Sequence, residues 1–146
     1  FEFFNLKEYM NEYAIIPTNI LRAVIYNKRV AGSYDLLKID NTPHYKMLLG
    51  DKEAYSEYTT ADPDSRHTVE NFQKLIHKFD PATVMCDNHN MISCQMDDTG
   101  YFIITDGLHR ASLMKFYNID FVRVKVRNPK LQNHYDFVKP DSLEVD

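Results

Sequence analysis

The sequence lacks the features that mark three large classes of protein. Its net charge is −4, whereas a generic nucleic-acid-binding protein usually carries an excess of lysine and arginine. It contains no run near the ~18 to 20 apolar residues that a helix needs to cross a bilayer. It also has no internal repeat and no low-complexity tract. These absences argue against a DNA-binding, a membrane-spanning and a repeat protein, so we expect neither DNA nor a membrane as partner.

Cysteine is also scarce, since the chain has only Cys86 and Cys94. Small secreted domains usually carry more cysteines, in a disulfide framework, so a cytoplasmic location is the simpler interpretation. His89 lies between the two cysteines, but the spacing fits no standard zinc pattern. We therefore predict two free thiols in strands with no metal between them. The chain begins with Phe1 rather than methionine, so we expect that a segment was removed before it.

The residues that are present suit one globular domain with a core. The chain has 146 residues, of which 44% are apolar and 26% charged. Apolar residues recur at helical spacing over residues 4–13. Beyond Pro17, a second set at Ile20, Leu21, Val24 and Ile25 fits one face of another helix. These patterns predict an N-terminal helical extension over residues 1–33.

The central part, residues 34–128, has mixed periodicity. It predicts a small mixed sheet with packed helices, an α+β fold, followed by a tail over residues 129–146 that has no strong period. The expected helices are residues 44–49, 52–58, 68–79 and 108–117. The expected strands are residues 34–39, 83–86, 91–96, 101–105 and 121–126.

One turn in this domain has the composition of an anion-binding site. Residues 102–104 are apolar, Thr105 and Asp106-Gly107 follow, and a helical pattern begins at Leu108. The first turn of a helix exposes unpaired N–H groups and the positive end of the dipole, and Gly107 lets a phosphate approach the backbone. Arg110 offers a planar fork for phosphate oxygens, and His109 can donate, accept or transfer a proton. Asp106 could hold Mg²⁺ or take a proton from a substrate hydroxyl.

The turn also has a purely structural interpretation, in which Asp106 caps the helix and His109 and Arg110 are solvated. Two residues able to carry positive charge at a helix start are electrostatically unfavourable without an anion, and this favours a site. The predicted phosphate-binding set comprises the turn and its flanks: Thr105, Gly107, Leu108, Arg110, Ala111 and Ser112. Three further residues could face the same cleft or be solvated: His44, Arg66 and His67.

The order of strand, Asp-Gly-Leu-His-Arg-Ala (residues 106–111), helix and strand resembles the ParB/sulfiredoxin superfamily over roughly residues 67–127. The resemblance implies a box that binds nucleotide phosphates. Sulfiredoxins have a catalytic cysteine directly before His-Arg, where this chain has Leu108. The partition proteins carry a DNA-binding domain after the box, and this chain ends soon after the last expected strand. The free-serine kinases carry Asp-Gly-x-His-Arg, which the residues from Asp106 to Arg110 match.

In those kinases the aspartate and the histidine are implicated in catalysis, which implies catalytic roles for Asp106 and His109. A glutamate in an upstream Pro-His-Glu-like segment is the candidate base, and here that segment ends in Tyr45. Asp40, Asp51 or no residue could replace it. The resemblance thus implies an ATP- or ADP-binding protein that uses Mg²⁺ to phosphorylate a small hydroxyl-bearing molecule. The alternative is a non-catalytic nucleotide-binding module, and a homo-oligomer stays open.

Overall fold

The computed structural model describes residues 12–27, 33–59, 67–87, 89–96 and 101–127. These residues form six strands, five α-helices and two short 3-10 helices. The strands are β1 (Glu12–Pro17), β2 (Leu21–Asn27), β3 (Ser33–Lys38), β4 (Ile92–Met96), β5 (Phe102–Asp106) and β6 (Phe121–Arg127). The helices are η1 (Thr18–Ile20), η2 (Ile39–Asn41), α2 (Pro43–Leu48), α3 (Lys52–Thr59), α4 (Val69–Lys78), α5 (Pro81–Cys86) and α6 (Leu108–Phe116).

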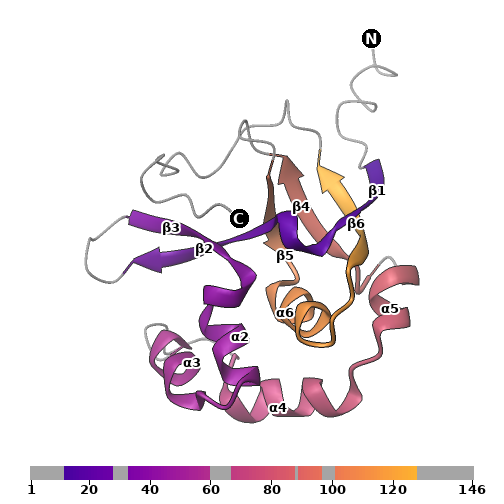
Figure 1. Cartoon of the computed structure of the whole chain (residues 1–146). Coiled ribbons are helices and arrows are strands. Elements are labelled where there is room, and N and C mark those ends of the chain that lie inside the picture. Colours follow the sequence, from indigo (N-terminus) through magenta and orange to yellow (C-terminus); the bar gives the residue numbers. More distant parts are fainter. Residues whose placement is uncertain (1–11, 28–32, 60–66, 88, 97–100, 128–146) are drawn as a thin grey trace.

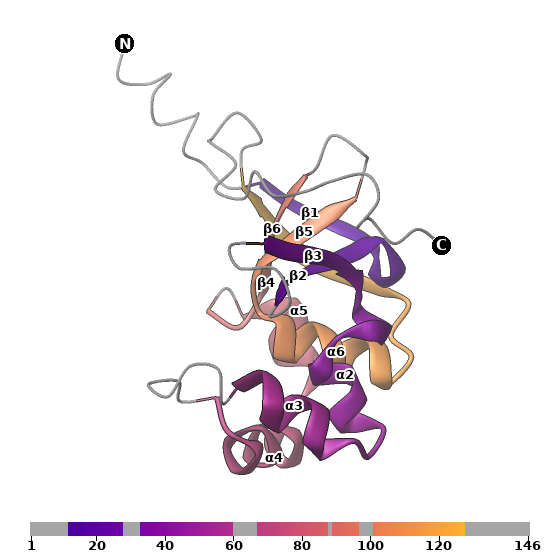
Figure 2. The ribbon, with the colours of Figure 1, turned by 90° about the vertical axis from the view of Figure 1, so that its left-hand side faces the viewer.

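All six strands belong to one mixed sheet in the order β1-β6-β4-β5-β2-β3. The strand β5 pairs in antiparallel fashion with β4 and in parallel with β2, while β6 runs parallel to β4 and antiparallel to β1. The five α-helices lie to one side of the sheet, with α6 next to the strands and α3 and α4 farther away (Figure 1, Figure 2). The predicted small α+β fold with a mixed sheet is therefore confirmed.

The N-terminal region corrects the sequence prediction. The expected second helix after Pro17 is instead η1 followed by the strand β2, and the expected extension over residues 1–33 contributes β1 and β2 to the main sheet. The first expected helix, residues 4–13, lies largely outside the described residues. Apolar residues in pairs fit the helical period and the strand period alike, but the β-branched residues Ile and Val favour strands. The exposed Pro17 ends the edge strand β1, where a missing N–H is tolerated.

A second correction concerns the expected strand at residues 83–86, which is the helix α5. Asp80-Pro81 ends α4, as predicted, but it also starts the next helix. The Asp80 carboxylate accepts a hydrogen bond from Ala82 N at 3.0 Å, and Pro81 occupies the first turn. The exposed Cys86 therefore lies in a helix, while Cys94 is buried in β4, and both are free thiols. Burial raises the pKa of the Cys94 thiol to about 12.

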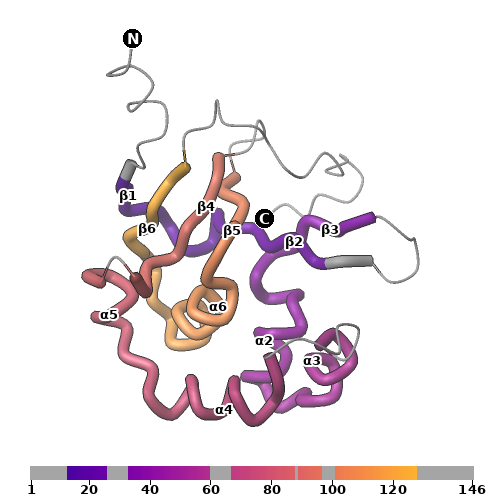
Figure 3. The backbone as a smooth tube through the Cα atoms, turned by 180° about the vertical axis from the view of Figure 1, so that it is seen from behind, coloured from indigo at the N-terminus to yellow at the C-terminus, as the bar shows by residue number. Residues whose placement is uncertain are grey.

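The helix α6 joins the two hydrophobic clusters of the described chain. Ala111 and Met114 pack with sheet residues such as Val122 and Val124. Leu113 packs instead in a second cluster with one residue each from α2, α3 and α4: Met47, Tyr55 and Phe72. Seen from behind, α5 lies toward β4 and β6, and α2 and α3 lie toward β2 and β3 (Figure 3). The start of α6 is thus held between the sheet and the outer helices.

Candidate functional site

The turn between β5 and α6 has the predicted geometry. The strand ends at Asp106, Gly107 is the N-cap residue, and α6 begins at Leu108. Gly107 adopts a left-handed conformation with φ of 98°, which favours glycine, and its carbonyl accepts the first helical hydrogen bond from Ala111 N at 2.8 Å. No side chain caps the first turn of this helix. Its first backbone N–H groups therefore lack the usual side-chain acceptor.

The guanidinium of Arg110 lies over Gly107. A Cβ added at Gly107 would lie 3.1 Å from Arg110 Nη2 and 3.3 Å from the backbone Cα of Ile92. Glycine at this position therefore leaves just enough room for the arginine to fold back across the turn.

Two oxygens hold Arg110 at long distances. Its Nη2 is 3.5 Å from Asp106 Oδ2, and its Nη1 donates to the carbonyl of His89 at 3.5 Å. Charge-assisted hydrogen bonds are usually 2.7–2.9 Å long, so neither of these contacts of the guanidinium is a strong one. The Arg110 side chain is 18% exposed and that of Asp106 is 74% exposed. The pair therefore lies at the surface, where a ligand could compete for the arginine.

His109 points away from this pair into a group of rings. Its Nε2 lies 2.7 Å from the hydroxyl of Tyr55 on α3. Its ring packs edge-on against His44 and Phe72, with centroids 4.5 and 4.8 Å apart, and stacks on the exposed His67 at 4.7 Å. Burial and, to a lesser degree, the neighbouring His67 and Arg110 together lower the pKa of His109 to about 4. The histidine is therefore neutral near pH 7.

His44 lies deeper in the same cluster and is 3% exposed. Burial is the main cause that holds its pKa well below 6.5, and His109 and His67 add to the effect. Its Nδ1 is buried with no hydrogen-bond partner among the described residues. The structure thus brings together three of the predicted residues, His44, His67 and His109, in one packed cluster. The fourth, Arg66, lies outside the described residues.

The remaining predicted residues divide into two groups. Thr105 is the last residue but one of β5, and its Oγ1 is buried with no partner among the described residues, so it could donate to a ligand. Leu108 packs against the core, and Ala111 and Ser112 are fully buried. The Ser112 hydroxyl donates to the Leu108 carbonyl at 2.9 Å. The structure therefore places the side chains of Leu108, Ala111 and Ser112 in packing roles, and their place in the phosphate-binding set stays a prediction.

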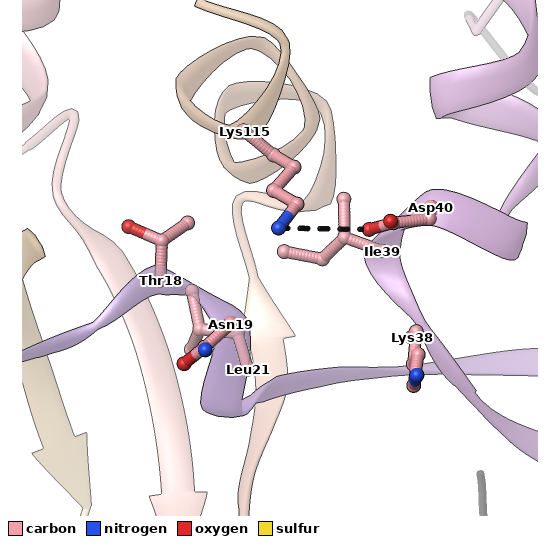
Figure 4. Close-up of a pocket in the computed structure, with 7 residues that line it drawn as sticks. All are labelled: Thr18, Asn19, Leu21, Lys38, Ile39, Asp40 and Lys115. Atoms are coloured by element: carbon pink, nitrogen blue, oxygen red, sulfur yellow. Dashed lines mark ion pairs between the residues drawn. The ribbon is translucent and has the colours of Figure 1, made fainter. Parts of the chain in front are cut away.

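Tyr45, which takes the place of the family's glutamate, and the two candidates for a general base, Asp40 and Asp51, have other roles. Tyr45 packs edge-on against Phe116, with centroids 6.4 Å apart. Asp51 accepts a hydrogen bond from Ala54 N at 3.1 Å and so caps the start of α3. Asp40 lies 3.9 Å from Lys115 Nζ, beside a cavity of about 60 Å³ toward the C-terminal end of α6 (Figure 4). The geometry therefore joins none of the three to the turn.

The described residues contain no group of three or more His, Cys, Asp and Glu side chains arranged to hold a metal ion. Asp106 alone offers an exposed carboxylate at the turn. Mg²⁺ commonly binds through one or two carboxylates together with substrate phosphates and water, so Asp106 suits it only in company with a nucleotide. Among the described helices, none is long and apolar enough to cross a membrane.

Sequence reasoning missed the partners of His109. Tyr55 is buried, and no sequence pattern indicated its hydrogen bond to a residue 54 positions away. Tyr55 and Phe72 lie on helical apolar stripes like any core residue. The pattern therefore gave no signal that their rings would surround His109.

Comparisons of this chain with protein-family models, with curated proteins and with solved structures find no match. The resemblance to the ParB/sulfiredoxin superfamily therefore stays a prediction from the box and its strand–helix–strand context. The physical argument for the site rests on the turn itself.

Proposed function

We propose that this chain binds a nucleotide through the N-terminal end of α6 and transfers its terminal phosphoryl group to a small hydroxyl-bearing molecule. The observation that supports it best is Arg110, a cation that lies over an uncapped helix start and is 3.5 Å from its anionic partner Asp106. Free backbone N–H groups, the helix dipole and a guanidinium together favour a phosphate. A nucleotide supplies that group.

The residues of the turn suit distinct tasks in this proposal. Gly107 and the first N–H groups of α6 would hold phosphate oxygens, Arg110 would neutralise their charge, and Thr105 Oγ1 would donate a further hydrogen bond. Asp106 would bind Mg²⁺ beside the phosphates. Phosphoryl transfer depends mainly on positioning and charge stabilisation, which these groups can provide. Because His109 is neutral and largely enclosed, it would act as a hydrogen-bond donor rather than as a cation.

A second candidate function is a nucleotide-binding module without catalysis. It is favoured by one observation, namely that Tyr45, Asp40 and Asp51 are each engaged away from the turn. A kinase of this kind would have to take its proton acceptor from Asp106 or from the substrate. The two functions share the same nucleotide site and differ only in turnover.

Calorimetry with ATP, ADP and other nucleotides, with and without Mg²⁺, tests the shared part of the proposal. Mass detection of phosphorylated small molecules then tests the kinase. Asp106→Asn should reduce turnover more than nucleotide affinity if Asp106 serves the metal or the proton. Nucleotide binding without any phosphorylated product would contradict the kinase and support the non-catalytic nucleotide-binding module. Failure to bind any nucleotide would contradict both functions.

A further inference from the structure

Tyr55 and His109 form a hydrogen bond whose direction can be worked out from burial. The Tyr55 hydroxyl and His109 Nε2 are 2.7 Å apart, and Tyr55 is 0% exposed. Either the hydroxyl donates to an unprotonated Nε2, or a protonated Nε2 donates to the phenol oxygen. The two cases place the proton of the neutral imidazole on opposite nitrogens.

A hydrogen bond donated by the Tyr55 hydroxyl satisfies more buried groups than one donated by His109 Nε2. Among the described residues His109 is the one hydrogen-bond partner of the Tyr55 hydroxyl. If Nε2 donated, the hydroxyl proton would be buried with no acceptor, and a buried donor without a partner is costly. If the hydroxyl donates, both the phenol proton and Nε2 are satisfied. Burial also raises the pKa of Tyr55 to about 12, so the phenol keeps its proton over the physiological range.

The other ring nitrogen of His109, Nδ1, then carries the proton. Among the described residues no hydrogen bond joins this nitrogen to another group, and His109 is half-buried rather than buried. The residue occupies the second position of α6, beside the N–H groups of the first turn.

We propose that Tyr55 is a positioning residue that holds His109 as its neutral Nδ1–H tautomer, so that the turn presents one more N–H donor to a bound phosphate group. The last step rests on the proposed function, whereas the tautomer does not. Burial is the main cause that keeps the ring neutral, and His67 before α4 and Arg110 from α6 itself add to the effect. His44 from α2 also faces the ring, with centroids 4.5 Å apart, and Tyr58 from α3 lies beside His44. A protonated ring would add positive charge beside two histidines and an arginine.

The first experiment is nitrogen-15 NMR of the histidine rings in the full, ligand-free chain at pH 7. We expect wild-type His109 to show a protonated Nδ1 and an unprotonated Nε2. Tyr55→Phe removes only the hydroxyl and should mix or reverse the tautomers. Tyr58→Phe is the matched control, because Tyr58 lies on the same helix and contacts His44, with ring centroids 5.3 Å apart. A protonated Nε2 in wild type would overturn the proposal, even if Tyr55→Phe failed to fold.

The second experiment separates the tautomer from the phosphate contact. An asparagine amide nitrogen reaches about the position of Nδ1, and a glutamine amide nitrogen that of Nε2, so ATP affinity is compared in His109→Asn and His109→Gln. We expect Asn to retain affinity within about two-fold and Gln to lose about five-fold, the effect of one neutral hydrogen bond. Equal loss in both variants would overturn the phosphate contact. Failure of wild type to bind ATP would contradict the proposed function and leave the NMR result standing.

Discussion

The two ends of α6 differ in how they meet the electrostatic needs of a helix. At the C-terminal end Lys115 lies in the last turn, Asn118 takes a positive φ of 60°, and Ile119 N donates to the Met114 carbonyl at 3.0 Å. These are the usual ways to end a helix. At the N-terminal end a cation, Arg110, lies where an anion is favoured, and no side chain caps the turn. One end of the helix is complete by itself, and the other has only the exposed Asp106 carboxylate, 3.5 Å from the guanidinium.

This contrast explains why the cavity alone does not identify the site. The cavity of about 60 Å³ lies at the complete end, where Lys115 already faces Asp40 (Figure 4). At the N-terminal end Arg110 lies over an uncapped turn, 3.5 Å from its anionic partner Asp106. A residue that breaks a local rule of helix stability, without a compensating gain in stability, is a better guide to function than a cavity.

The largest expected effect tests the enclosed histidine at the N-terminal end. The pKa of His109 is about 4 in the fold and about 6.5 when unfolded, so the unfolded chain binds more protons between these values. Its contribution to the free energy of unfolding is therefore full above pH 6.5 and falls as the pH drops toward 4, by on the order of 3 kcal/mol. Urea unfolding at several pH values should show this slope, and His109→Asn should flatten it. The exposed His77→Asn serves as control, and an unchanged slope in His109→Asn would contradict the assignment.

The second largest effect is expected on nucleotide affinity when Arg110 is replaced. Arg110→Ala should weaken nucleotide binding by about 1.5–3 kcal/mol, because it removes a charge-assisted contact. Arg110→Lys should recover only part of the loss, since an ammonium cannot reproduce the fork. Calorimetry measures both, with Arg127→Ala, an exposed arginine at the end of β6, as the matched control. Wild-type affinity in Arg110→Ala would reduce the turn to a structural feature.

A smaller effect separates backbone strain from crowding at the turn. Gly107 and Gly50 both have φ near +100°, at 98° and 108°. Alanine at either should cost roughly 1–3 kcal/mol through strain. Only Gly107→Ala also places a Cβ against Arg110 and Ile92, since a Cβ at Gly50 meets nothing within 4 Å. Thermal unfolding should therefore show the greater loss for Gly107→Ala, and nucleotide affinity should fall only in that variant.

The smallest effect is expected at the complete end of the helix. The Lys115–Asp40 pair is 3.9 Å apart and partly exposed, and such pairs contribute about 0–1 kcal/mol. Lys115→Met should change the midpoint of urea unfolding little and leave nucleotide affinity within two-fold. A large loss of affinity in this variant would move the site to the other end of α6.

The sequence predicted the elements whose signals are local. Thr68 accepts a hydrogen bond from Asn71 N at 3.1 Å and caps α4, Gly107 has a positive φ, and Asn118 follows α6 with a positive φ, so these helix ends have local causes. The strand β2 was missed because the apolar pairs at residues 20–21 and 24–25 fit the helical period as well as the strand period. The pairing of β2 with β3 and with the distant strand β5 decides between the two periods.

The candidate site was predictable only in part for the same reason. The order of strand, glycine and helix is local, so the turn could be located from Asp106 to Arg110. The pairing of His109 with Tyr55 depends on how α3 packs on α6, and no pattern within either helix encodes it. The burial that lowers the pKa of His109 could therefore not be anticipated.

The pairing of β1 with β6 bears on how the chain is made. Glu12 lies opposite Val126, and Pro17 opposite Phe121, so the earliest described strand pairs with the latest one. Likewise Leu21 of β2 lies opposite Phe102, which leads into the turn. A ribosome releases the chain from its amino end, so β1 must wait, unpaired, until β6 has been synthesised. Assembly of the sheet is thus a late, long-range event, and a fragment of residues 67–127 would leave β5 at an open edge, exposed to pairing with other chains.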